Sequence, residues 1–185
     1  MPRKRLPGWL WILPAGFTTL KTLEETNTFC GSCHTQPEST YLERLIAAPA
    51  VDLASAHQQA KPAVRCIDCH SGAGLTGRAA GMLDGALNAV AFITRTAQQP
   101  ARLRGPYPND YCLKCHSGVL VGEADQNNHF HIFLPKLKQA NPQAGNCVDC
   151  HSTHATDGEV NLGYLNRART EAVCEQCHNT FGEGG

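Results

Sequence analysis

Ten cysteines occur in the 185-residue chain, and all of them fall into five pairs with two intervening residues. A histidine directly follows each pair. Because only 9 of the 185 residues are histidine, chance would place one after all five pairs with a probability of roughly 10⁻⁷. One chemistry must therefore need the histidine at that position each time.

C-x-x-C-H is the attachment motif of c-type haem. The two thiols add across the porphyrin vinyl groups as thioethers, and the adjacent imidazole binds the iron as proximal ligand. Zinc sites and disulfide frameworks use paired cysteines but do not require these histidines, and redox C-x-x-C centres occur singly. We therefore predict five covalently attached haem c groups. The attachment residues are Cys30, Cys33, Cys66, Cys69, Cys112, Cys115, Cys147, Cys150, Cys174 and Cys177, and the proximal ligands are His34, His70, His116, His151 and His178.

The remaining composition leaves little material for a hydrocarbon core, because aromatic residues make up only 6% of the chain. We expect a mainly α fold with extensive coil, a haem-packed core and little or no sheet. The apolar spacing of Met82, Leu83, Leu87, Val90 and Ile93 predicts a helix over 76–99. Two further helices are expected over 38–48 and 164–173.

The first twenty residues form an N-terminal segment with a basic head (1–5) and an uncharged apolar stretch (6–20). As a helix, this stretch is ~22 Å long, shorter than the ~30 Å hydrocarbon layer of a bilayer. A short membrane anchor, an interfacial segment and a cleaved signal peptide all fit the pattern. We expect retained membrane association and a division into 1–20 and a pentahaem domain over 21–185. Because c-type haem is attached outside the cytoplasm, we place the domain on the periplasmic side of the cytoplasmic membrane.

Four histidines lie outside the motifs and are candidates for the distal axial ligands: His57, His129, His131 and His154. A neutral imidazole on each side saturates a haem iron. In extended chain His129 and His131 would face opposite ways and serve different haems. Four histidines leave one iron without a distal ligand, and Met82 is a candidate for it, although it also fits the apolar face of its helix.

The chain resembles the NapC/NirT family of membrane-anchored multihaem quinol dehydrogenases. The resemblance lies in residues 16–34 around the first motif, in His57 ahead of the second motif, and in the segment Cys-Val-Asp-Cys-His-Ser-Thr-His that ends at His154. It implies a haem ladder beside the bilayer, with quinol contact at the first haem. It also implies that His57 ligates the fourth haem, His129 or His131 the second, and His154 the third. Members of the family usually have four haem motifs, whereas this chain has five. In its number of motifs the chain is also similar to the pentahaem subunit of alternative complex III.

Three functions remain open from the sequence. The first is an electron relay, as a subunit of a membrane-bound quinol-linked respiratory or photosynthetic complex that delivers electrons to a periplasmic redox partner. The alternative is a small reductase of the nitrite or hydroxylamine type with one open haem site, and a filament-forming haem protein is a third, less supported hypothesis. The balance of 16 basic and 16 acidic residues argues against a nucleic-acid partner.

Overall fold

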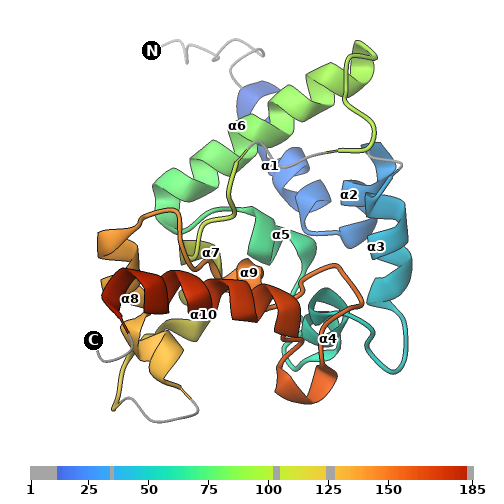
Figure 1. Cartoon of the computed structure of the whole chain (residues 1–185). Helices are drawn as coiled ribbons and strands as arrows, with labels where there is room; N and C mark the ends of the chain where they lie inside the picture. Colours follow the sequence, from blue (N-terminus) through green and yellow to red (C-terminus); the bar gives the residue numbers. More distant parts are fainter. Residues whose placement is uncertain (1–11, 34–35, 102–104, 124–127, 183–185) are drawn as a thin grey trace, which may run out of the picture.

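A computed structural model of the chain describes residues 12–33, 36–101, 105–123 and 128–182 (Figure 1). Within these residues the fold is helical with extensive coil and without strands, and two isolated bridges join Leu165 to His151 and to Glu159. The predicted fold class is therefore confirmed. The predicted proximal ligand His34 and the basic head of the N-terminal segment lie outside the described residues.

The helices are short, and most are separated by coil. In chain order they are α1 (Ile12–Glu24), α2 (Asn27–Cys33), α3 (Glu38–Leu45), α4 (Leu53–Gln59), α5 (Cys66–His70), α6 (Gly74–Ile93), α7 (Asp110–His116), η2 (Ser117–Leu120), α8 (His129–Ala140), α9 (Cys147–Cys150), η3 (Val160–Leu162) and α10 (Arg167–Phe181).

The three helices expected from the sequence are present, with shifted ends. The helix over 38–48 is α3, and the helix over 76–99 is α6, which ends at Ile93 because Arg95 takes a left-handed φ of 58°. The helix over 164–173 is α10, which starts only at Arg167. Tyr164 has a φ of 61°, and the side chain of Asn166 caps the helix by accepting from the Arg169 N–H at 2.9 Å.

The hydrocarbon core is very small. Among the described residues, the buried apolar side chains are Leu45, Leu137, Ala144 and Tyr164. Many large apolar side chains of the described residues are exposed instead, among them Ile46, Leu75 and Ile93. The polypeptide alone therefore leaves much of its apolar surface uncovered, as expected for a chain that folds around prosthetic groups.

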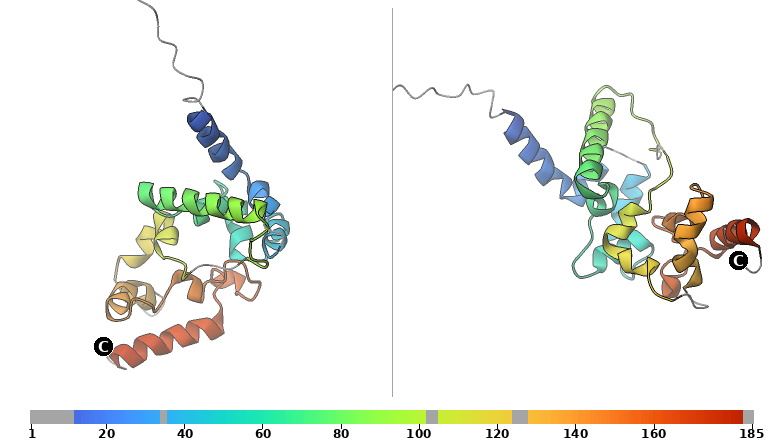
Figure 2. Two further views of the ribbon diagram at one scale, coloured as in Figure 1. Left: turned by 90° about the horizontal axis from the view of Figure 1, so that it is seen from above. Right: turned by 90° about the vertical axis from the view of Figure 1, so that its left-hand side faces the viewer.

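The elements at the two ends of the sequence also lie at opposite ends of the molecule. Both views in Figure 2 place α1 at one end and α10 at the other. The long helix α6 crosses the α1 end and is joined to it by an ion pair between Arg78 and Glu24. No helix formed by the described residues is long and apolar enough to cross a bilayer.

Candidate haem-binding site

Every C-x-x-C pair lies on a helix, as the chemistry of haem attachment requires. α2, α5, α7, α9 and α10 each carry one pair, so the two cysteines of a motif are one helical turn apart. Asp68 starts α5 by accepting from the Arg65 N–H at 2.9 Å, and Asp149 starts α9 by accepting from the Asn146 N–H at 2.8 Å. None of the nine cysteine side chains that the structure describes forms a disulfide, so these thiols remain available for thioether bonds.

Three of the motif histidines lie opposite a histidine from elsewhere in the chain. The ring centroids are 6.0 Å apart for His57 and His116, 6.1 Å for His70 and His154, and 6.3 Å for His131 and His151. Two imidazoles that bind one metal from opposite sides have centroids about 6 Å apart, because each metal–nitrogen bond is about 2 Å and the nitrogen is about 1 Å from its ring centre. The three pairs therefore fit haem iron with two histidine ligands.

Backbone carbonyls lie against Nδ1 of two of these rings. Nδ1 of His57 lies 2.8 Å from the Leu53 carbonyl, and Nδ1 of His151 lies 2.7 Å from the Gly163 carbonyl. When Nδ1–H donates to a carbonyl, the lone pair of Nε2 is left free for a metal.

Desolvation acts on three of the paired rings. It lowers the pKa of His70, His131 and His154, and the adjacent rings of His151 and His70 lower the pKa of His131 and His154 further. Desolvation therefore favours the neutral form of these three imidazoles, which is the form that binds iron.

The observed pairing differs from the one that the family resemblance implied. His57 faces the third motif rather than the fourth, and His154 faces the second motif rather than the third. His131 faces the fourth motif rather than the second. Contacts between distant segments determine this arrangement: Arg44 on α3 donates to the His154 carbonyl at 2.8 Å across 110 residues.

The structure places no second imidazole beside the other predicted ligands that it describes, which are His129, His178 and Met82. His129 and His131 lie on helix α8 and not in extended chain as expected, and the ring next to His129 is that of Phe130, 5.6 Å away. Among the motif histidines that the structure describes, His178 is the one without a second imidazole beside it. Met82 is half-buried on α6, and its role as a ligand stays a prediction.

The first and second motifs are in direct contact, and so are the third and fourth. The Cys66 N–H donates to Oδ1 of Asn27, three residues before Cys30, at 3.0 Å. In the same way, the Cys147 N–H donates to Oδ1 of Asn109 at 2.8 Å.

Different contacts join the second motif to the third and the fourth to the fifth. The Tyr107 hydroxyl donates to the Cys69 carbonyl at 2.5 Å, and the Lys114 ammonium donates to the Asp68 carbonyl. The Asn166 N–H donates to the Cys150 carbonyl at 2.8 Å, which fixes the start of α10 beside α9. The five motifs therefore follow one another in space in the order in which they occur in the sequence.

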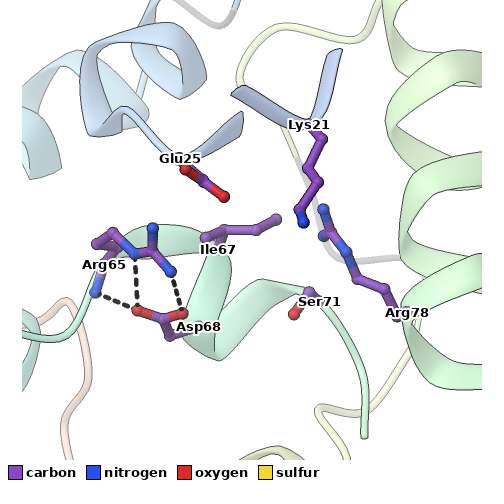
Figure 3. Close-up of a pocket in the computed structure, with 7 residues that line it drawn as sticks. All are labelled: Lys21, Glu25, Arg65, Ile67, Asp68, Ser71 and Arg78. Carbon is purple, nitrogen blue, oxygen red and sulfur yellow. Dashed lines mark hydrogen bonds and ion pairs between the residues drawn. The ribbon is translucent and has the colours of Figure 1, made fainter. Parts of the chain in front are cut away.

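A cavity of about 160 Å³ lies between α1, α5 and α6 and was not expected from the sequence (Figure 3). The Lys21 ammonium and the Arg78 guanidinium point toward one another across it, whereas Arg65 is paired with Asp68 at 3.1 Å. Nη1 of Arg78 is buried without a hydrogen-bond partner. Arg78 is also paired with Glu24, and Glu25 lines the cavity with Lys21, so the lining offers both hydrogen-bond donors and acceptors.

Comparison with protein families gives an independent indication. Residues 140–183, which contain the fourth and fifth motifs, match the family model described as a doubled CXXCH motif. No curated protein and no solved structure matches the chain. Together with the motif geometry, the family match defines a multihaem c-type cytochrome with covalently bound haem c. The protein is accordingly a haem c electron-transfer protein.

Proposed function

We propose that the chain binds five haems and relays electrons along them in the order of the motifs. Haem c supplies one-electron chemistry, and the polypeptide determines which haem lies next to which. The contact of each motif with its successor, from α2 to α10, is the observation that carries this proposal. Because α1 and α10 lie at opposite ends, such a relay would run along the length of the molecule.

Saturated iron suits a relay, because an iron with two protein ligands has no free position for substrate. The three imidazole pairs support saturation of the second, third and fourth haems. We propose His154, His57 and His131, respectively, as the distal ligands of these haems. His129 and Met82 remain the candidates for the other two.

We further propose that the α1 end faces the cytoplasmic membrane and receives electrons from quinol within a larger complex, and that the α10 end faces a periplasmic acceptor. α6 supports a contact with lipid or another subunit, because Leu75, Leu83 and Ile93 on it are 91%, 63% and 77% exposed. The cavity beside α1 supports quinol binding, since Lys21 and Arg78 can donate to the quinol oxygens and Glu25 can accept a hydroxyl proton. A quinol gives up two electrons and two protons, and the protons would leave to water.

The reductase alternative has one observation in its favour, which is that His178 has no described imidazole opposite it. An open fifth haem would bind carbon monoxide when reduced, and about one fifth of the total haem would then change its spectrum. A relay with saturated iron is expected to show no such change.

Co-purification tests the membrane-complex proposal. The tagged protein, extracted from membranes of its own organism with mild detergent, is expected to retain integral membrane subunits that reduce its haems when quinol is added. Recovery of the holoprotein in the soluble fraction after lysis, with no partner subunit and no haem reduction by quinol, would contradict the proposal.

A further inference from the structure

Two asparagines in equivalent positions hold two pairs of motifs together. Asn27 lies three residues before Cys30 and accepts from the backbone N–H of Cys66, 39 residues later in the chain. Asn109 lies three residues before Cys112 and accepts from the backbone N–H of Cys147, 38 residues later. In each case an asparagine at the start of one motif helix holds the first residue of the next motif helix.

The surroundings of the two asparagines repeat as well. Both receiving helices, α5 and α9, have an aspartate in the third position that accepts from the backbone N–H of the residue before the first cysteine. The first cysteine of each of these motifs also contacts the first cysteine of its partner motif: Cys30 contacts Cys66, and Cys112 contacts Cys147. A hydrogen bond from Cys66 lowers the pKa of Cys30 to about 7, and one from Cys147 lowers the pKa of Cys112 to about 7.

A second hydrogen bond fixes the orientation of each asparagine side chain. Nδ2 of Asn27 donates to Oε1 of Gln58 at 2.8 Å, and Nδ2 of Asn109 donates to the Gly145 carbonyl at 3.4 Å. Each amide nitrogen is therefore engaged elsewhere, and each amide oxygen faces the following motif. The junction between the second and third motifs is built differently, from Tyr107 and Lys114.

We propose that the chain contains two copies of a two-motif module, motifs one and two and motifs three and four, and that Asn27 and Asn109 are positioning residues that fix the distance between the two haems of each module. The proposal rests on haem attachment at these motifs. The first cysteines of a module touch, and each would carry one thioether bond to its own porphyrin. The asparagine that fixes these cysteines thereby holds the edges of the two porphyrins together.

The test is the electron paramagnetic resonance spectrum of the oxidised holoprotein. Two low-spin ferric haems in contact give a broadened interaction signal, whereas separated haems give independent signals. In the wild type we expect the interaction signal from both modules. Asn27→Leu is expected to remove it from the first module, Asn109→Leu from the second, and the double variant from both. Asn27→Asp and Asn109→Asp keep the accepting oxygen and are expected to retain the signal.

Asn141→Leu is the matched control, because Oδ1 of Asn141 also accepts a backbone N–H, that of Gln143 at 3.2 Å, but joins no two motifs. Haem content and the optical spectrum show whether each variant is loaded and folded. Independent signals from all haems of the wild type, or loaded leucine variants that keep both interaction signals, would overturn the proposal. Either result would be compatible with the proposed electron relay, because a relay requires only that electrons pass between successive haems.

Discussion

Replacement of His154 by alanine is expected to open one haem to external ligands. In the structure the His154 ring lies 6.1 Å from that of His70, and its other neighbour, the Tyr41 ring, stacks on it at 4.2 Å and holds it in position. Without it, the iron at the second motif would lack its sixth ligand. The reduced His154→Ala variant is expected to bind carbon monoxide at about one fifth of its haem, measured by difference spectroscopy, whereas the wild type binds none at this site.

Variants of neighbouring residues separate loss of a ligand from general disruption. Tyr41→Phe keeps the ring that stacks on His154 and is expected to bind no carbon monoxide at the second haem. His57→Ala and His131→Ala are each expected to open one further haem, because each faces a different motif. A His154→Ala protein that keeps all of its haem and remains unreactive toward carbon monoxide would show that this imidazole is not a ligand.

Replacement of Lys114 by glutamine is expected to lower the reduction potentials of the second and third haems. The Lys114 ammonium donates to the carbonyls of Asp68 and Gly72, so it lies between these two motifs. A nearby positive charge disfavours the ferric state, and its removal makes that state easier to reach. A unit charge about 10 Å from an iron, at an effective dielectric constant of about 20, contributes about 1.7 kcal/mol, or about 70 mV for one electron.

Solvent screening reduces this value, because Lys114 is an exposed residue. Spectroelectrochemical titration of Lys114→Gln is therefore expected to show two haems shifted down by roughly 20–50 mV. Lys114→Arg keeps the charge and serves as the control. Unchanged potentials in the glutamine variant, or an equal shift of all haems, would contradict the placement of this charge at the junction of the second and third motifs.

Features that depend on neighbouring residues were predictable from the sequence. Haem attachment is encoded within each motif, and the apolar spacing of Met82, Leu83, Leu87, Val90 and Ile93 placed α6. Helix ends were less predictable, because the left-handed backbone of Tyr164 and Arg95 interrupts an otherwise helical pattern. The small hydrocarbon core also followed from composition, since a chain so poor in aromatic residues has little with which to build one.

The pairing of histidines was not predictable, because it depends on contacts between distant segments. Arg44 on α3 fixes the backbone of His154, and the buried capping box of Asp52 and Ser55 starts the helix that carries His57. The order of the motifs in space likewise depends on contacts such as that of Asn109 with Cys147. Comparison of the segments before the first and third motifs would have shown the shared asparagine, although not its partner.

The intact mass of the mature, denatured protein is the most direct test of the central claim that this polypeptide folds around covalently bound porphyrins. Thioether bonds survive denaturation, so the mass is expected to exceed that of the processed chain by five haem groups. Iron-free expression is expected to give a chain that does not become compact, because its own apolar side chains bury so little surface. A mass increase other than five haems, or a compact chain without haem, would contradict the account.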